Sequence, residues 1–210
     1  MSIQLDKVQP KTKEQLKQLI NYAFKHNIYD LNFIDTSKIK DMSKLFMSCE
    51  YDFDVSSWDV SNVTNMSQMF YFCANFNCDL SGWDVSNVKN MYQIFYGCIR
   101  LNTDLSIWNV SNVTNMNHMF FACENFDIKC FESWDVSNVT DMTSMFAFCN
   151  KFDCDLSNWD VSNVTGMYFM FGHCNQFNCD LSHWNTSKVK DMKDMFTGCN
   201  RLTIPDWYKK

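Results

Sequence analysis

Apolar positions along most of the chain follow two spacings in turn. Leu80, Trp83 and Val85 have the spacing of a strand whose alternate side chains are buried. The apolar residues that follow are three or four positions apart: Met91, Ile94, Phe95 and Cys98. That second spacing is typical of one face of a short helix. The pattern therefore predicts a strand, a turn and a helix in this part of the chain.

This pattern recurs with a period of 25 residues. The tryptophans show it best, with steps of 25 and a single step of 26: Trp58, Trp83, Trp108, Trp134, Trp159 and Trp184. The best-kept frame reads D-L-S-x-W-D-V-S-N-V-x-N-M-x-x-M-F-x-x-C-x-x-F, and a degenerate earlier copy has Ile34 in the tryptophan position. The sequence therefore predicts seven repeats over residues 30–204.

Each predicted helix is preceded by a residue that favours helix starts. The position holds Asn, Asp or Gly in every copy: Asp41, Asn65, Asn90, Asn115, Asp141, Gly166 and Asp191. A side-chain oxygen or an unhindered backbone can serve the free N–H groups of a first helical turn. We expect the helix of each repeat to begin here.

A repeat of 25 residues cannot bury its own apolar stripe, so its copies are expected to stack on one another. The predicted fold is a right-handed α/β repeat solenoid of about seven strand–turn–helix units. Its strands would form one parallel sheet, its helices the opposite face, and its tryptophans an inward structural column. A more β-rich solenoid with helical turns is the alternative.

Both ends of such a stack need a cover. Residues 1–29 are expected to form an amino-terminal helical cap, because one helical face is apolar: Leu16, Leu19, Ile20, Ala23 and Phe24. Thr12 and Gln15 have the spacing of a capping box. Residues 205–210 depart from the repeat frame and are expected to close the carboxyl-terminal end, so the chain is predicted to be one structural domain.

The frame W-D-V-S-N-V-T-N-M-x-x-M-F-x-x-C closely resembles the 25-residue repeat of BspA-like bacterial proteins, a group also described from mycoplasma lipoproteins. Six copies match it nearly residue for residue, as from Trp58 to Phe70, and the match covers about residues 11–204. The resemblance implies a leucine-rich-repeat-like solenoid, used as an adhesion or protein-interaction module and often found at the cell surface. It brings no catalytic residues to carry over.

The composition fits a folded chain with an acidic middle. Hydrophobic residues make up 46% of the sequence, with 19 Phe and 7 Trp, which supplies a core. The net charge is −6, but residues 45–187 hold four basic residues against 16 acidic ones, for a net charge of −12. A surface of this sign disfavours nucleic acid as a partner.

The sequence shows neither a membrane span nor an export signal. No apolar run reaches the roughly 18 residues of a span, and the first residues lack the apolar core of a signal peptide. A cytoplasmic location is therefore the expectation, with secretion or the cell surface as the alternative if a signal was removed. The odd count of 11 cysteines also favours reduced thiols.

The sequence lacks the residue patterns that are typical of metal binding or catalysis. Cysteines come as C-x4-C in three repeats, but the second of each pair is replaced by Phe53 and Thr103 elsewhere, as expected of a packing residue. The four histidines occupy different repeat positions, and the serines recur as turn residues. We expect no cofactor, no metal and no enzymatic activity.

Two repeated columns are candidates for partner binding. One follows the tryptophans and would form an acidic strip on the strand face: Asp59, Asp84, Asn109, Asp135 and Asp160. These side chains could instead make only local hydrogen bonds. The other column is aromatic and would lie on the helices, where packing between neighbouring helices is the alternative: Tyr71, Tyr96 and Phe121.

The predicted function is a non-enzymatic protein-interaction module whose unknown partner has a basic surface. A same-sign surface steers such a partner and makes its binding sensitive to salt. A structural or self-associating protein of the surface or adhesin type is the alternative.

Overall fold

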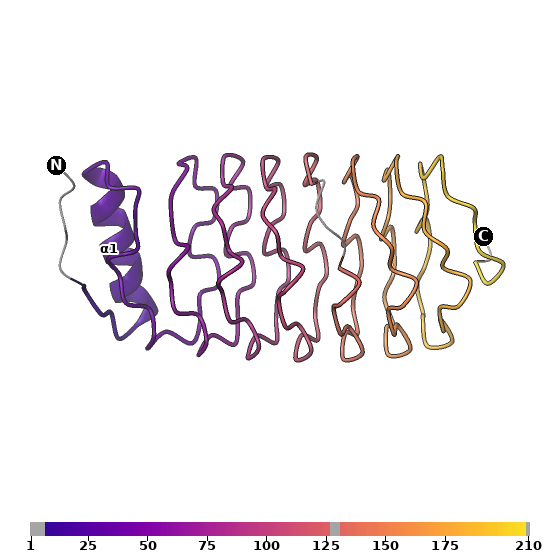
Figure 1. The fold of residues 1–210 in the computed structure, drawn as a ribbon, viewed down its shortest axis with the longest axis horizontal. Helices are drawn as coiled ribbons and strands as arrows, with labels where there is room; N and C mark the ends of the chain where they lie inside the picture. Colours follow the sequence, from indigo (N-terminus) through magenta and orange to yellow (C-terminus); the bar gives the residue numbers. More distant parts are fainter. Residues whose placement is uncertain (1–6, 127–130, 209–210) are drawn as a thin grey trace.

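The computed structural model describes residues 7–126 and 131–208. It is an elongated row of irregular coils stacked side by side, with the helix α1 (Lys13–Lys25) across the amino-terminal end of the row (Figure 1). Within the described residues α1 is the only α-helix, and no extended strand is present. Isolated parallel bridges join equivalent positions of successive coils, as between Asn65 and Asn90 and between Asn90 and Asn115.

The predicted strand–turn–helix repeat is wrong, and with it the leucine-rich-repeat-like α/β solenoid. Each coil is a succession of four-residue turns, in which a buried residue accepts the N–H three positions later. One coil contains such turns from Val55 to Trp58, Val60 to Val63, Met66 to Met69 and Phe70 to Cys73, with N···O distances of 3.1, 2.8, 3.1 and 3.0 Å. Because both ends of each turn are buried, apolar residues recur every three positions and imitate one face of a helix.

Backbone conformation excludes a helix where one was predicted. Gln93 and Gly97 have left-handed φ angles of 53° and 71°, which no α-helix contains. Alternate N–H groups of this stretch donate to the next coil instead of to residues four positions earlier: Met91 to Asn115, Gln93 to Asn117, Phe95 to Met119 and Gly97 to Phe121. Those in between close turns with residues three positions earlier, as Ile94 does with Met91. The N–H groups that would build a helix therefore join the coils or close turns.

The residues expected to start helices make turns instead. Asn90 Oδ1 accepts the N–H of Tyr92 at 3.0 Å, and Asp141 Oδ1 accepts that of Thr143 at 2.9 Å. These are Asx turns, in which a side-chain oxygen accepts from the backbone two residues on. The side chain serves a free N–H group, but the chain then bonds to the neighbouring coil and no helix follows.

Inward aromatic rings form columns through the stack. The rings of Trp83 and Trp108 are parallel with centroids 6.5 Å apart, and those of Phe70 and Phe95 are 5.5 Å apart. Each repeat tryptophan is buried and donates its indole N–H to a carbonyl of the preceding coil: Trp58 to Leu31, Trp83 to Val55, Trp108 to Leu80, Trp134 to Leu105, Trp159 to Phe131 and Trp184 to Leu156. The polar atom of each ring is thus satisfied inside the core.

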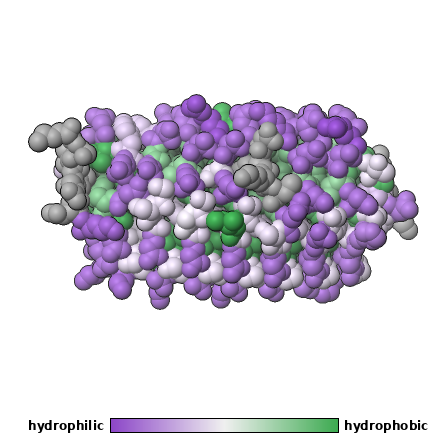
Figure 2. All heavy atoms as spheres, in the orientation of Figure 1, coloured by the Kyte–Doolittle hydropathy of each residue, from purple (hydrophilic) through white to green (hydrophobic). Residues whose placement is uncertain are grey.

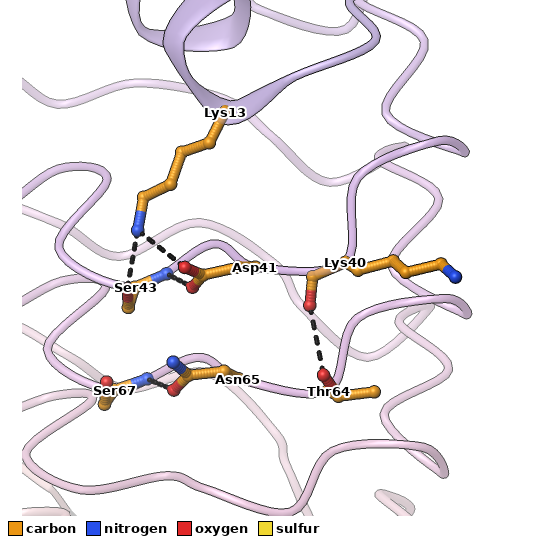
Figure 3. A network of polar contacts seen from close by, with 7 residues as sticks. All are labelled: Lys13, Lys40, Asp41, Ser43, Thr64, Asn65 and Ser67. Carbon is orange, nitrogen blue, oxygen red and sulfur yellow. Dashed lines mark hydrogen bonds and ion pairs between the residues drawn. The ribbon is translucent and has the colours of Figure 1, made fainter.

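α1 covers the amino-terminal end of the stack. The helix follows Thr12, whose hydroxyl accepts the N–H of Gln15 at 3.2 Å. Its buried residues belong to the same core as the coils: Leu16, Ile20 and Ala23. Lys13 extends from the helix to the first coil, where its Nζ lies 3.1 Å from Oδ2 of Asp41 and 2.5 Å from Oγ of Ser43 (Figure 3).

The carboxyl-terminal residues continue one of the internal columns. Trp207 donates its indole N–H to the carbonyl of Leu181 at 2.8 Å, and its ring lies 6.4 Å from that of Trp184. The ring of Tyr208 meets Phe196 edge-on, with centroids 5.0 Å apart. These rings cover the tryptophan side of the last coil.

Candidate functional site: two acidic columns along the coils

The aspartates that follow the tryptophans are exposed and held by turns rather than placed on a strand face. Asp59 Oδ1 accepts the N–H of Ser61 at 3.0 Å and its hydroxyl at 2.6 Å. Asn109 accepts from Ser111 in the same way, at 3.2 and 2.7 Å. The backbone part of this turn recurs in the other members of the column: Asp84, Asp135 and Asp160. We call these five residues the first acidic column.

A second acidic column was not predicted from the sequence. Each member precedes the first-column position of its own coil by five residues: Asp54, Asp79, Asp104, Asp155 and Asp180. Asp54 Oδ1 accepts the N–H of Ser56 at 2.8 Å, and Asp79 Oδ1 accepts that of Ser81 at 2.9 Å. The signal was present, because the frame D-L-S-x-W-D-V-S contains the D-x-S turn motif twice. The two columns flank the turn that ends at the buried tryptophan.

Hydrogen bonds from serine lower the pKa of several of these carboxyl groups. The hydroxyl and then the N–H of Ser86 lower the pKa of Asp84. In the second column the N–H and hydroxyl of Ser81 lower the pKa of Asp79, and they outweigh both its desolvation and the charges of neighbouring aspartates. The same serine bonds lower the pKa of Asp155, Asp160 and Asp180. These groups are therefore ionised at neutral pH.

No direct ion pair neutralises the first acidic column within the described part of the chain, although the charge of Lys188 contributes to lowering the pKa of Asp160. The ion pair in the described residues lies outside this column and joins Lys13 to Asp41, at the amino-terminal end of the stack. No lysine, arginine or histidine of residues 7–126 and 131–208 lies within 4.0 Å of the carboxylates of Asp59, Asp84, Asp135 and Asp160. The hydrogen bonds that these carboxylates accept all end on Oδ1. The column thus presents acceptor oxygens in fixed positions.

Shallow hollows lie along the second acidic column. One, of about 400 Å³, is lined by Tyr29, Asp30, Asp52, Phe53, Asp54, Ser56, Cys78 and Asp79. The thiol of Cys78 faces Asp54 with an Sγ···Oδ1 distance of 3.4 Å, and Cys179 faces Asp155 at the same distance. Across the described residues no three His, Cys, Asp or Glu side chains converge closely enough to hold a metal ion. The hollows therefore offer acceptor oxygens along a groove rather than a coordination site.

The candidate aromatic residues form a stacked row on the surface. The rings of Tyr71 and Tyr96 are 4.9 Å apart at 26°, and those of Tyr96 and Phe121 are 4.5 Å apart at 8°. They lie in turns, not on the predicted helices, and are half-buried. Because the rings face one another, their edges rather than their flat faces point away from the stack. Hydrophilic side chains dominate the face shown in Figure 2.

The inward cysteines are bonded to the backbone. Cys98 Sγ donates to the carbonyl of Phe70 at 3.0 Å, and Cys123 Sγ to that of Phe95 at 3.1 Å. Burial raises the pKa of the Cys98 thiol well above its usual value and that of Cys73 to about 12. A protonated, buried thiol is a packing group and a poor nucleophile. No disulfide joins the cysteines in the described part of the chain.

Comparison with known proteins identifies the family of the chain. A family model described as "Mycoplasma protein of unknown function, DUF285" matches residues 14–131 and 119–208. No curated protein and no solved structure matches the chain. Within the described residues no helix is long and apolar enough to cross a membrane.

Proposed function

The chain belongs to the Mycoplasma family of unknown function DUF285, and we propose that it is a non-enzymatic protein-binding module whose two acidic columns receive a basic surface of another protein. The observation that carries the proposal is the first acidic column. Its four carboxylates occupy the same position in their coils, with an amide at Asn109, are fixed by Asx turns and make no ion pair within 4.0 Å among the described residues.

Fixed charge that makes no direct ion pair is well suited to steering a partner. Residues 45–187 carry a net charge of −12, and like charges on one scaffold raise the association rate of an oppositely charged protein. Parallel backbone pairing sets a spacing of about 4.8 Å from coil to coil. A partner that places lysine or arginine side chains along this axis could contact several carboxylates at once.

The hydroxyl and thiol groups that could act as nucleophiles already make hydrogen bonds within the fold, which supports a role without catalysis. The hydroxyl of Ser61 donates a hydrogen bond to Asp59, and the thiols of Cys98 and Cys123 donate to backbone carbonyls. Burial lowers the pKa of His118, whose neighbour across Nδ1 is the amide oxygen of Asn117 rather than a carboxylate. These groups therefore have structural partners in place of the base and orienting residue that a nucleophile needs.

The test begins with an affinity pull-down from source cells, with identification of the partner by mass spectrometry. Binding of that partner is then measured at low and high salt for two triple variants. One changes Asp59, Asp84 and Asp135 to Asn, and the other changes Tyr71, Tyr96 and Phe121 to Ser. Asparagine is a conservative choice, because Asn109 already makes the same turn with Ser111.

The proposal predicts that the Asn variant weakens binding by at least about tenfold and flattens its salt dependence. The aromatic variant should bind like the parent chain. Loss of binding in the aromatic variant alone, with no effect of salt, would show that the first acidic column is structural and that the aromatic row carries recognition.

A second candidate is a structural or self-associating surface protein of the adhesin type. The repeated, elongated stack supports it, since successive coils already bury one another's apolar faces. The resemblance of the repeat frame to that of BspA-like surface proteins also supports this second candidate. Labelling of intact source cells with an antibody to this chain, together with sedimentation of the purified protein, distinguishes a displayed or self-associating protein from the partner-binding module.

A further inference from the structure

Two cysteines at the same position of successive coils line one hollow. Cys154 and Cys179 are one repeat apart, and each is followed by an aspartate. The hollow has a volume of about 520 Å³ and is bordered by both cysteines, by His183 and by three acidic residues: Asp153, Asp155 and Asp180. Two thiols and several carboxylates therefore share one solvent-accessible space.

The register of the coils places these two cysteines within the range of a disulfide. Phe152 and Phe177 lie two positions before them, and their rings stack with centroids 5.6 Å apart. Successive coils paired in parallel lie about 4.8 Å apart along the stack, and disulfides span Cα···Cα separations of about 4.4–6.8 Å. Equivalent cysteines of successive coils meet this requirement, so rotation about their Cα–Cβ bonds can bring the two sulfur atoms together.

A single cysteine at this position has a structural role. The sulfur atoms accept backbone N–H groups of the preceding coil at 3.1–3.4 Å: Cys78 from Val55, Cys154 from Phe131 and Cys179 from Leu156. In another coil Thr103 does the same, because its Oγ1 accepts the N–H of Leu80 at 3.2 Å. One acceptor per coil satisfies this structural need, whereas two thiols in succession add a chemistry that threonine lacks.

The inward cysteines are stacked in the same way but are closed to reagents. Cys149 and Cys174 are fully buried, and each thiol donates to a carbonyl of the preceding coil at 2.9 Å. Cys154 and Cys179 instead border the hollow, with exposed fractions of 2% and 8%. A dissolved reagent therefore meets Cys179 first, and Cys154 lies one coil away from the product.

Negative charge lies beside the thiols. Oδ1 of Asp155 is 3.4 Å from Sγ of Cys179, and hydrogen bonds from Ser157 and Ser182 lower the pKa of Asp155 and Asp180. Burial, with a smaller contribution from the Asp155 carboxylate, raises the pKa of Cys179 to about 11. The thiolate is therefore scarce at neutral pH, and the carboxylates attract a cationic reagent and repel an anionic one.

We propose that Cys154 and Cys179 form a disulfide-exchange site for small, positively charged disulfides, and that the reaction ends in a bridge between two coils. The Cys179 thiolate attacks one sulfur of the reagent, whose S–S bond breaks, and half of the reagent stays on Cys179 as a mixed disulfide. The Cys154 thiolate then attacks Sγ of Cys179 and releases the second half. Two thiols of the chain are oxidised, the reagent is reduced to two thiols, and the departing thiolates take up the two protons that the cysteines lose.

The test treats the full native chain, reduced beforehand, with cystamine, a disulfide that carries two ammonium groups, at about pH 8.5, where more of the thiol is ionised. After the remaining thiols are blocked and the chain is digested without reduction, mass spectrometry should find the peptides of Cys154 and Cys179 joined. Cys78 has Phe53 and Thr103 at its position in the neighbouring coils, so it should carry at most a mixed disulfide.

The charge preference is tested with oxidised glutathione, which is anionic, in place of cystamine. Each rate of bridge formation is divided by the rate at which the same reagent modifies the denatured chain, which removes differences in intrinsic reactivity. The normalised rate should be at least about tenfold higher for cystamine, and about 0.5 M salt should narrow the difference because it screens the carboxylates.

Threonine provides matched variants, because Thr103 already fills this position with its bond to Leu80 in place. Cys154→Thr should leave Cys179 with a mixed disulfide and no bridge, whereas Cys78→Thr should leave the bridge unchanged. Cystamine treatment should raise the midpoint of thermal unfolding of the parent and of Cys78→Thr by about 5 °C, since the bridge closes a loop of one repeat. It should not raise that of Cys154→Thr.

Three outcomes would overturn the proposal. One is a first bridge elsewhere, either between two inward cysteines such as Cys49 and Cys73 or to Cys130, which lies outside the described residues. Another is a mixed disulfide on Cys179 that never proceeds to a bridge with Cys154. The third is an equal normalised rate for cystamine and oxidised glutathione. None of these measurements depends on a protein partner, so the result is independent of the proposed binding function.

Discussion

The indole nitrogen of Trp108 lies 3.0 Å from the carbonyl oxygen of Leu80, 28 residues earlier in the sequence. The ring is 2% exposed, so this bond satisfies two polar groups inside the core. The same ring stacks on Trp83 of the preceding coil and tilts against Phe95. Each tryptophan therefore holds its own coil to the one before it by both packing and a hydrogen bond.

Trp108→Ala should destabilise the fold by about 3–5 kcal/mol, because it opens a cavity and leaves the Leu80 carbonyl without its donor. The adjacent Ile107 is 70% exposed, so Ile107→Ala should change stability by less than about 0.5 kcal/mol. Urea unfolding followed by circular dichroism measures both. A cost below about 1 kcal/mol for Trp108→Ala would contradict the packing described here.

The period of the repeat was readable from the sequence, but the local structure was not. Spacings such as those of Met91, Ile94 and Phe95 arise both from a helix and from four-residue turns with buried ends, so periodicity alone could not separate them. The deciding feature is a left-handed backbone at residues such as Gln93 and His118, whose φ angles are 53° and 54°. Side chains of these types give little local signal for that conformation, which the bonds to the next coil stabilise.

Of the two acidic columns, only the first was predicted from the sequence. The first acidic column was visible because it follows a tryptophan, which is easy to align between repeats. Asp54 and Asp79 belong to the same kind of turn, but they precede the predicted strand, and no role was predicted for their position. Recognition of D-x-S as a turn motif at both positions would have shown the second column as well.

Lys44→Gly and Lys40→Gly test the turn conformation at two exposed lysines. Lys44 has a φ of 56°, which glycine adopts without strain, whereas Lys40 is not in the left-handed region. Lys44→Gly should be neutral or slightly stabilising, and Lys40→Gly should cost about 1 kcal/mol. If thermal unfolding shows both variants destabilised by about the same amount, as two helical or extended positions would be, the left-handed assignment is wrong.

The buried thiols should resist modification until the chain unfolds. Burial raises the pKa of Cys73 to about 12 and those of Cys98 and Cys123 well above the usual value, so little thiolate is present at neutral pH. Reaction with an aromatic disulfide reagent should be at least about 100-fold slower in the native chain than in denaturant. Among the cysteines that the structure describes, Cys49 is partly exposed and should react first, and the denatured chain should yield all 11 thiols. Rapid native reaction of several thiols, or a deficit after denaturation, would contradict this.

Acid should remove a part of the stability that Asp84 supplies. Its pKa is lowered in the folded chain by the hydroxyl and N–H of Ser86, so its contribution is present above the unfolded value, near pH 4, and is lost as the pH falls through the lower folded value. Asp84→Asn keeps the turn, as Asn109 shows, but cannot take up a proton. The stability advantage of the parent chain over Asp84→Asn should therefore be constant above about pH 5 and shrink between about pH 5 and pH 2.

The reverse substitution supplies the matched control for the acid experiment. Asn109→Asp places a carboxylate on the same turn with Ser111, in which Asn109 Oδ1 accepts the N–H at 3.2 Å and the hydroxyl at 2.7 Å. This variant should gain the acid-dependent term that Asp84→Asn loses, with the same sign and over the same pH range. Urea unfolding at a series of pH values measures both differences. If the three stability curves ran parallel from pH 7 to pH 2, the serine bonds would fix the side chain without favouring its charge, and the repulsion among carboxylates would cancel the benefit.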